Sequence, residues 1–439
     1  MTRLLVGNEF NEDRFAVADA KRKQSGWWTQ RLLWQAVDDD ILVLPVAPER
    51  SYLDYVTGLT GTDSATLRIV VPPVGQLGVG VLSPDRLTDP EFLAEVRAAV
   101  GGRTVTEVCW LHPDSSIARL AEAIGAADAL PGFAFLAQGG GRLANSKAAF
   151  RAVAAGAGVP LPDGGVCTDQ ATAAALIGDM LDAGHPVILK HDFRTGGRGN
   201  EIVAPASGVL PVGAQRVVVI ADRPALVTYL ASRWDWLTSH GHTPVVVERY
   251  HPDHRAVFLE YLITDAGIEL AGQGEMLSAP VAIAEVIPAP DLTPTTMAAL
   301  VDGAERLCES LRALGYRGLL SADSLVTPDG VFFSEYNGRV TGSTHIYGVV
   351  GAKLVGPDYA DRRVLLERDD WKVPSLEAAL AALTRAGLAF DPESGTGVVA
   401  VMPHNTSNGT LRYCYVAATL AEAWAGQERV EALLAPVPQ

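Results

Sequence analysis

The chain has 439 residues and a formal net charge of −16, and 48% of its residues are hydrophobic. A chain of this length exceeds one ordinary hydrophobic core, so we expect about two or three domains. The acidic balance argues against a nucleic-acid partner, because sequence-independent binding depends on Lys and Arg contacts to phosphates. It weakly favours a substrate that carries positive charge. No apolar run approaches the roughly 20 residues of a membrane span, so we expect no membrane partner.

The N-terminus and the cysteines indicate the compartment. Met1–Gly7 reads as a short strand and lacks the apolar core and cleavage site of a signal peptide. The four cysteines are scattered, without the spacing of a zinc site or a disulfide framework. We therefore expect free thiols in a cytoplasmic protein.

Residues 1–138 alternate short apolar runs with helical patterns. The runs are rich in Val, Ile and Leu, and they are Arg3–Gly7, Ile41–Pro45, Leu67–Pro72 and Val105–Leu111. The helical stretches lie near Trp28–Val37, Pro90–Val100 and Ser115–Ile124. This alternation predicts a parallel sheet with helices on its faces. Three consecutive glycines make Ala137–Arg142 the best candidate for a linker to the next domain.

Two lysines mark the next segment. Asn145 or Ser146 is expected to cap a helix that begins near Lys147. A Lys in the first turn of a helix opposes the helix dipole, so we expect a negative group near it, an exposed surface lysine being the alternative. Val187–Lys190 reads as a buried strand that ends in a charge, and the loop His191–Asn200 follows it. Its glycines allow backbone N–H groups to close around a phosphate, although a plain hairpin loop would have the same composition.

A second apolar strand, Pro244–Tyr250, carries the carboxylate of Glu248 near its end. Such a strand end could hold the edge of a purine, or Glu248 could form an ordinary ion pair with a neighbouring Arg. Thr293–Leu314 follows with apolar residues at helical spacing and a Thr-Pro start, which predicts a helix that packs on the core.

The segment Leu319–Asn337 predicts a β-hairpin that reverses at Thr327–Gly330. If Pro328, Asp329 and Gly330 form a three-residue loop with a glycine bulge, Thr327 faces Val331. Counting back from that pair places Asp323 opposite Glu335 and Ser321 opposite Asn337.

Directly opposed carboxylates destabilise a ribbon unless a cation lies between them. Two carboxylates and an amide oxygen on one face suit Mg²⁺, which often also binds substrate phosphates. A solvated acidic ribbon is the alternative, and a one-residue slip in register would separate Asp323 from Glu335.

Further polar residues follow the hairpin. If the strand continues, Arg339 joins the same face, where its guanidinium could grip a phosphoryl group. Gly342, Ser343 and Thr344 could donate hydrogen bonds to a substrate carboxylate or form an ordinary turn, and His345 could contact substrate or pack in the core. Residues 374–439 read as a small α/β domain.

The order of these motifs resembles that of the ATP-grasp ligases. The quoted segments are NSKAAFR (145–151), TGGRGN (195–200), SADSLVTPDG (321–330) and SEYNGRVTGSTH (334–345). They are most similar to those of the pheganomycin-type peptide ligases. The resemblance implies an α/β chain with three parts: a Rossmann-like pre-ATP-grasp domain (1–138), a two-subdomain ATP-grasp domain (139–373) and a small C-terminal α/β domain (374–439).

The resemblance also implies a nucleotide site. In the family, residues at the positions of Lys147 and Lys190 contact the α-phosphate, and the second also reaches the adenine. The remaining implied nucleotide contacts lie in the phosphate loop and at the end of the purine-binding strand: Thr195, Gly196, Gly197, Arg198, Gly199, Glu248, Arg249, Tyr250 and His251. Many members carry a ribose-binding Glu seven residues beyond the purine-binding one, where this chain has Arg255, and Asp253 is a nearby substitute.

The implied chemistry is ATP-driven. Asp323, Glu335 and Asn337 would hold two Mg²⁺ ions, with Glu335 bridging them, and Arg339 would stabilise an acyl phosphate. The implied catalytic residues are Lys190, Glu335 and Arg339. The substrate contacts would be Arg339, Gly342, Ser343, Thr344 and His345.

The resemblance implies an ADP-forming peptide ligase. It would join a small, amino-acid-like carboxylate, nonproteinogenic or guanidino-bearing in one version, to the N-terminal amine of a peptide in antibiotic biosynthesis. Two alternatives stay open: a dipeptide or amino-acid ligase with the same fold, and an ATP-binding regulatory protein without catalysis. The sequence leaves the oligomeric state open, a homodimer being one option.

Overall fold

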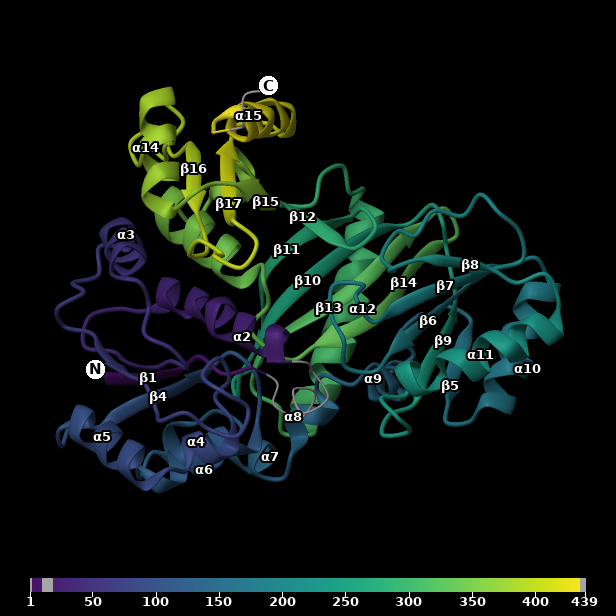
Figure 1. Cartoon of the computed structure of the whole chain (residues 1–439), viewed down its shortest axis with the longest axis horizontal. Helices are drawn as coiled ribbons and strands as arrows, with labels where there is room; N and C mark the ends of the chain where they lie inside the picture. The colour runs from purple at the N-terminus through teal and green to yellow at the C-terminus, as the bar shows by residue number, and fades with distance from the viewer. Residues whose placement is uncertain (1, 10–18, 435–439) are drawn as a thin grey trace.

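Three β-sheets organise the chain in the computed structural model, which describes residues 2–9 and 19–434 (Figure 1). The first sheet has the order β3-β2-β1-β4, and its pairings are parallel. Its strands are β1 (Thr2–Val6), β2 (Ile41–Val43), β3 (Arg68–Val70) and β4 (Val105–Trp110). The parallel sheet predicted for the N-terminal residues is therefore confirmed.

Helical segments connect and cover these strands. They are α2 (Asp19–Trp28), the 3₁₀ segment η1 (Thr29–Gln35), α3 (Arg50–Thr60), α4 (Pro84–Leu87), α5 (Pro90–Val100), α6 (Ser115–Ala123) and η2 (Ala127–Ala129). The helix expected near Trp28–Val37 is thus a helix end followed by a 3₁₀ segment. The predicted glycine linker forms two short helices, α7 (Phe133–Ala137) and α8 (Gly140–Leu143), which pack closely. A Cβ atom at Gly141 would lie 2.1 Å from the carbonyl oxygen of Pro113.

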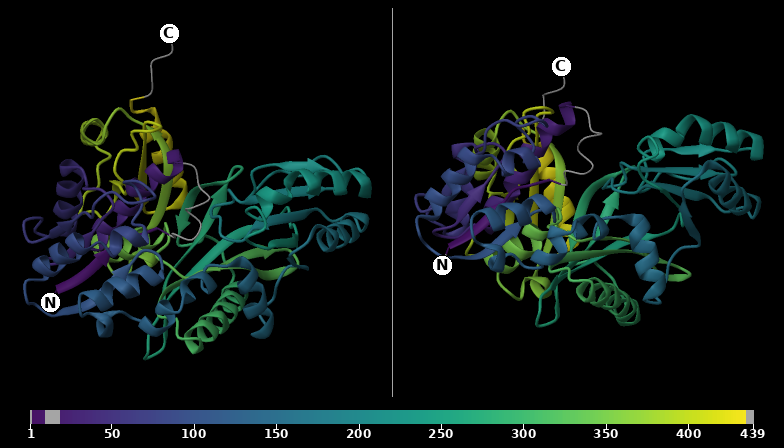
Figure 2. Two further views of the ribbon diagram at one scale, coloured as in Figure 1. Left: turned by 60° about the horizontal axis from the view of Figure 1, so that its bottom comes forward. Right: turned by 90° about the horizontal axis from the view of Figure 1, so that it is seen from below.

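The second sheet projects from the rest of the molecule with its helices, as Figure 2 shows. Its order is β5-β9-β6-β7-β8. The strands are β5 (Gly164–Cys167), β6 (Val187–His191), β7 (Asn200–Ala204), β8 (Val217–Val219) and β9 (Val245–Arg249). Helices α10 (Gln170–Asp182) and α11 (Arg223–Leu237) pack on it and share a separate hydrophobic cluster with it. Helix α9 (Lys147–Gly156) connects this unit to the N-terminal domain.

The third sheet is the largest and has the order β14-β13-β10-β11-β12-β15-β17-β16. The strands are β10 (Arg255–Ile263), β11 (Ile268–Ser278), β12 (Ala282–Ile287), β13 (Gly318–Thr327), β14 (Gly330–Asn337), β15 (Val364–Lys372), β16 (Gly397–Ala400) and β17 (Thr410–Ala417). The C-terminal strands therefore continue the central sheet across residue 373. The remaining helices are α12 (Pro294–Ala313), η3 (Ile346–Val355), α13 (Tyr359–Arg362), α14 (Leu376–Ala386) and α15 (Leu420–Ala432).

The hairpin β13–β14 confirms the predicted acidic pair but corrects the predicted loop. Thr327 pairs with Gly330, not with Val331, so the loop has two residues. The register then shifts between Asp323 and Ser324, which restores the predicted opposition of Asp323 and Glu335. The extra residue therefore lies in a bulge within the strand, and a local pattern of turn residues does not reveal it.

Helix α12 supports the hairpin from below. Its apolar residues share one hydrophobic cluster with Phe333 and Tyr336 of β14. The ring of Phe333 fills the space beside Gly303, where a Cβ atom would lie 2.2 Å from a ring carbon. Within the described ranges no helix is long and apolar enough to cross a membrane. The four cysteines are free thiols, of which Cys109 is half-buried and the others are buried.

Gly303→Ala tests the packing under the hairpin. We expect it to destabilise the protein by about 1–3 kcal/mol, because the added methyl group overpacks a tight contact with Phe333. Gly156→Ala is the matched control, since it is helical with open space around it, and it should be neutral or slightly stabilising. Urea unfolding measures both. Equal effects of the two substitutions would contradict this description of the core.

Candidate active site

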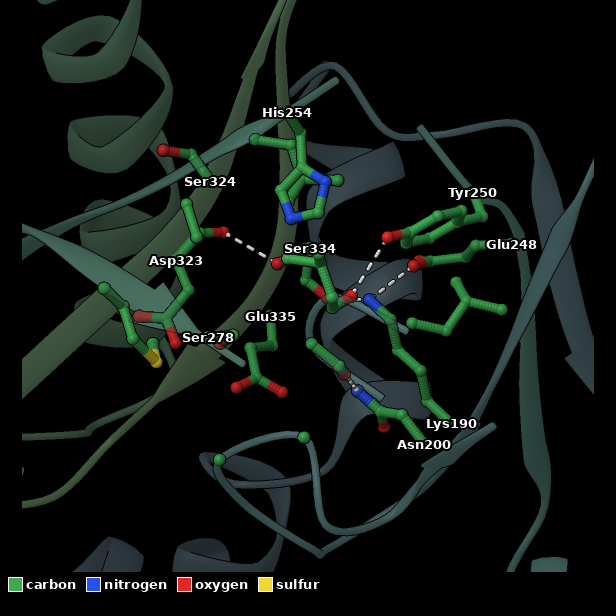
Figure 3. Close-up of a pocket in the computed structure, with 18 of the residues that line it drawn as sticks. Lys190, Asn200, Glu248, Tyr250, His254, Ser278, Asp323, Ser324, Ser334 and Glu335 are labelled. Atoms are coloured by element: carbon green, nitrogen blue, oxygen red, sulfur yellow. Dashed lines mark hydrogen bonds and ion pairs between the residues drawn. The ribbon is translucent and has the colours of Figure 1, made fainter. Parts of the chain in front are cut away.

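One pocket lies between the five-stranded sheet and the eight-stranded sheet, and Figure 3 shows it in close-up. Side chains from both sheets line it: Ile188 and Lys190 from β6, Glu248 from β9, Phe258 from β10, Met276 from β11, and Asp323 and Glu335 from the hairpin. Its empty volume is about 860 Å³, including open solvent at the mouth.

The predicted acidic pair faces this pocket (Figure 3). Burial and the charge of Glu335 raise the pKa of Asp323 to about 8. Burial would also raise the pKa of Glu335, but Lys147 and Lys190 outweigh it and lower that pKa to about 2. The amide nitrogen of Asn337 donates to Asp323 Oδ2 over 2.9 Å. The pKa of one carboxylate is thus raised and that of the other is lowered, although the two groups line the same pocket.

Lys147 has the negative neighbour that its position in the first turn of a helix predicts, and this neighbour is Glu335. Ser146 is the N-cap of α9, and Asp192 accepts hydrogen bonds from both the Ser146 hydroxyl and the Ala148 amide. These contacts tie the start of α9 to the end of β6. Lys147 Nζ then lies 2.9 Å from Glu335 Oε2 and donates to the carbonyl oxygen of Arg194 over 2.7 Å.

Lys190 and Glu248 form the second buried charge pair. Strands β6 and β9 pair Ile188 with Glu248, which places Lys190 diagonally across from Glu248 on the same face. Lys190 Nζ lies 2.5 Å from Glu248 Oε2, and Arg151 of α9 lies 2.5 Å from Glu248 Oε1. Glu248 is only 1% exposed. Glu248 therefore forms an ion pair with a neighbouring Arg, as one of the two interpretations expected, and it also lines the pocket.

The glycine loop lies at the mouth of the pocket, and Gly196 and Gly197 line it. Both glycines have positive φ angles, 61° and 75°, which other residues rarely adopt. The expected loop residues Thr195, Arg198 and Gly199 are adjacent but do not line the pocket. The loop is held from below, because its Arg194 carbonyl accepts from Lys147.

Only some of the residues expected at the end of β9 line the pocket. Arg249 and Tyr250 line the pocket, whereas His251 does not and instead stacks on Phe332 with ring centroids 5.1 Å apart. At the expected ribose position, Arg255 points elsewhere and pairs with Glu275 over 2.6 Å. Asp253 is exposed and does not line the pocket.

His254 lines the pocket in their place. His254 directly precedes β10, whose residues Ala256, Val257 and Phe258 also line the pocket.

Arg339 lies just beyond the hairpin. Strand β14 ends at Asn337, so the strand does not continue as the sequence interpretation required. The Arg339 guanidinium donates to Asn145 Oδ1 over 2.6 Å, and its charge still reaches Asp323 and Glu335, whose carboxylates oppose the lowering of the Arg339 pKa by burial.

The loop after Arg339 is anchored by Glu260, a buried residue that the sequence did not single out. Glu260 accepts hydrogen bonds from the hydroxyl groups of Thr341, Thr344 and Tyr347 over 2.5–2.7 Å. Gly342 is half-buried, whereas Ser343, Thr344 and His345 are buried. A buried carboxylate surrounded by three hydroxyl donors therefore fixes the shape of the loop.

The charge distribution of the pocket suits a metal-bound nucleotide. Within residues 2–9 and 19–434 there is no group of three or more His, Cys, Asp or Glu side chains that could hold a metal by itself. Asp323 and Glu335 are two incompletely compensated carboxylates beside the Asn337 amide. Mg²⁺ takes one or two carboxylates and completes its shell with waters and phosphates, so these residues fit it.

The sequence interpretation missed several pocket residues. Asn200, Met276, Ser278, Ser324 and Ser334 line it. Asn200, Ser324 and Ser334 lie within the quoted motif segments but were given no role of their own, whereas Met276 and Ser278 lie in no such segment. Arg151, Asn145 and Glu260 act through other side chains. Arg151 and Asn145 belong to the same short helical segment as Lys147, which was the one available signal.

Two segments match known domain families. Residues 29–126 match the pre ATP-grasp domain, and residues 378–430 match the PGM1 C-terminal domain. No curated protein matches the chain by sequence.

Solved structures match almost the whole chain. The ADP complex of an N5-carboxyaminoimidazole ribonucleotide synthetase matches with a TM-score of 0.59 and 12% identity over 98% of this chain and 95% of that one. The chain's fold is the ATP-grasp fold.

Two further ATP-grasp structures show the same arrangement. An L-amino acid ligase from Bacillus licheniformis matches with a TM-score of 0.55 and 13% identity, over 100% of this chain and 98% of that one. The biotin carboxylase domain of a Hydrogenobacter thermophilus 2-oxoglutarate carboxylase, crystallised with MgADP, matches with a TM-score of 0.56 and 15% identity, over 98% and 89% of the two chains. The predicted architecture of a pre-ATP-grasp domain, an ATP-grasp core and a C-terminal α/β part is confirmed.

Glu248→Gln tests the buried charge pair of this ATP-grasp pocket. We expect a loss of about 3–5 kcal/mol in stability without nucleotide, because Lys190 and Arg151 lose their buried counter-charge. Glu309→Gln, which removes a surface partner of Arg312, should change stability by less than about 1 kcal/mol. Thermal unfolding compares the two variants. A Glu248→Gln protein as stable as the control would contradict the assigned pairing.

Proposed function

We propose that the chain is an ADP-forming ATP-grasp ligase that activates a carboxylate as an acyl phosphate and joins it to an amine. The carrying observation is the convergence of Asp323 and Glu335 with Lys147 and Lys190 in one pocket beside a glycine loop. Phosphoryl transfer asks a protein mainly for positioning and charge neutralisation, and this arrangement offers both.

The known structures support ATP as the nucleotide. The synthetase is an ADP complex, and the biotin carboxylase domain holds MgADP. In this chain Lys147 and Lys190 would bind phosphates, the backbone of Gly196 and Gly197 would cover them, and Arg249 and Tyr250 would lie along the purine. Thr195, Arg198, Gly199 and His251 are proposed as outer contacts that reach the nucleotide when the loop closes. Glu248 would orient Lys190, since its carboxylate already binds that ammonium group.

Asp323, Glu335 and Asn337 are proposed to hold Mg²⁺. The resemblance to the family implies two ions. When bound, Mg²⁺ would neutralise phosphate charge and orient the γ-phosphoryl group. Glu335 lies between Asp323 and Lys147, so it is the residue of the set that can serve two ligands at once.

The proposed reaction has two steps. A substrate carboxylate oxygen attacks the γ-phosphorus, the bond from that phosphorus to the bridging oxygen breaks, and ADP leaves. The amine nitrogen then attacks the acyl carbon, the carbon–oxygen bond to phosphate breaks, and the nitrogen loses a proton. Arg339 would stabilise the acyl phosphate, while Gly342, Ser343, Thr344 and His345 would position the substrate. Because water would hydrolyse the intermediate, closure of the glycine loop is part of the proposal.

The finer proposal is a peptide ligase of natural-product biosynthesis, acting on a small amino-acid-like carboxylate and the N-terminal amine of a peptide. The segments that resemble pheganomycin-type ligases and the PGM1 C-terminal match support it. A dipeptide or amino-acid ligase is the second candidate, favoured by the fold shared with the L-amino acid ligase. A homodimer is also proposed, because the structurally similar biotin carboxylase domain forms a dimer.

Incubation with ATP, Mg²⁺ and panels of acids and amines tests the reaction class. We expect release of ADP and phosphate that depends on both substrates, measured by chromatography, and no AMP. Formation of AMP and pyrophosphate would refute the proposal, and nucleotide binding without turnover would favour the regulatory alternative. Equal rates with free amino acids and peptides as acceptors would favour the dipeptide ligase.

Glu335→Gln tests the metal assignment. We expect turnover to fall at least about 1,000-fold, because Mg²⁺ and the transferring phosphoryl group lose a carboxylate ligand. Circular dichroism should show an unchanged fold. Asp329→Asn, at the exposed tip of the same hairpin, should keep full activity. Normal activity of Glu335→Gln would remove the metal assignment.

A further inference from the structure

A second charged site lies at the junction of three segments that are far apart in the sequence. Trp28 and Arg31 come from the N-terminal domain, Gly342 comes from the loop after the hairpin, and Arg412 comes from β17. In Figure 1, α2 lies directly below the C-terminal strands. The guanidinium carbons of Arg31 and Arg412 lie 4.6 and 4.7 Å from the centre of the Trp28 ring.

The substrate loop is part of this junction. Arg31 donates to the carbonyl oxygen of Val340 over 3.3 Å. A Cβ atom at Gly342 would lie 3.7 Å from both Arg412 and Trp28. Trp28, Gly342 and Arg412 are half-buried, so they form the open edge of the junction, with Arg31 behind them.

Arg31 carries a buried charge that the carboxylates of Glu9 and Glu260 offset only in part. Its side chain is 2% exposed, and it forms no ion pair among the described residues. It donates to two backbone carbonyl oxygens, and its Nε has no acceptor. Burial lowers its pKa to about 9; the charge of Glu9 opposes this lowering, and those of Arg339 and Arg412 add to it. By contrast, Arg412 has its own carboxylate partners, Glu367 and Asp369.

Arg86 shows what a purely structural buried arginine looks like in this chain. It is also 2% exposed. It donates five hydrogen bonds to backbone carbonyl oxygens, so each of its N–H groups has an acceptor. Arg31 differs from it in having an unsatisfied donor and two cationic neighbours.

His345 adds further unsatisfied polar atoms at the same place. It is 1% exposed, and its ring lies near the backbone of Val401 but makes no hydrogen bond of ordinary geometry to Val401 or to another described group. Burial, with smaller effects of Arg31 and Arg412, lowers its pKa to about 3, so the ring is neutral and carries one N–H donor. Buried donors that lack acceptors in the empty protein are suited to a bound anion.

We propose that Arg31, with His345 beside it, binds a substrate carboxylate at this junction. The inference rests on the proposed ligase function and extends it, because it gives the N-terminal and C-terminal parts a shared role in holding substrate. A guanidinium beside a neutral imidazole N–H matches the planar, doubly accepting form of a carboxylate. The carboxylate belongs either to the acid that is activated or to the C-terminus of the amine acceptor.

Arg31→Met separates these sources. Hydroxylamine replaces the acceptor in one assay, so the rate of hydroxamate formation reports on the activated acid alone. In the second assay, dialanine and dialanine amide are compared as acceptors. We expect KM to rise about 10- to 100-fold, in the first assay if the activated acid is the ligand and only for dialanine if the acceptor is. In both cases KM for ATP should stay unchanged.

Unfolding measurements supply a test that needs no turnover. Arg31→Met should leave the protein without substrate as stable as the wild type or more stable, because it removes an incompletely compensated buried charge. Dialanine or the acid substrate should raise the melting temperature of the wild type more than that of the variant. Arg86→Met is the matched control, and it should destabilise the protein without changing substrate affinity.

Three results would overturn the inference: a destabilised Arg31→Met protein with unchanged KM values in both assays, equal ligand stabilisation of the variant and the wild type, or a rise in KM for ATP alone. A wild-type protein that forms no hydroxamate would instead count against the proposed ligase function, and the melting experiment would still decide on the carboxylate site.

Discussion

The candidate active site depends on two carboxylates that oppose each other across one hairpin. Asp323 and Glu335 face each other across the hairpin and are partly buried. Their mutual repulsion destabilises the site unless positive charge compensates it. Lys147 compensates Glu335 from one side, and Lys190 adds its charge from the other. Removing one member leaves another buried charge unpaired, which is why the pocket is stable only as a set.

The lysines reach this place through elements that otherwise serve packing. Asp192 at the end of β6 caps α9 and so joins Lys147 to the strand that carries Lys190. Glu248 and Arg151 then fix the position of Lys190 from the neighbouring strand and helix. Under the proposed function, a nucleotide that enters the pocket would exchange these internal pairs for contacts with its phosphates.

The C-terminal part participates in the central sheet more directly than a separate domain would. Strands β15, β17 and β16 extend the sheet that begins with the hairpin. This continuity brings Arg412 beside the loop held by Glu260 and opposite Trp28 of the N-terminal domain. Three distant parts of the chain thus meet at the loop 341–345.

The sequence by itself determined the elements whose causes are local. Period and turn residues predicted the helices α5, α6 and α12 and the hairpin, and the pairing of Asp323 with Glu335 followed from counting along two strands. The predicted loop was one residue too long, and a bulge near Ser334 restored the pairing of Asp323 with Glu335. The sequence did not reveal this bulge, because bulges depend on packing against α12 and the neighbouring strand. Only the tertiary structure revealed that His254 rather than Arg255 lines the pocket, that Glu260 anchors the loop 341–345, and that Arg31 is buried without an ion pair among the described residues. These facts depend on contacts between residues dozens to hundreds of positions apart, and no local pattern encodes them.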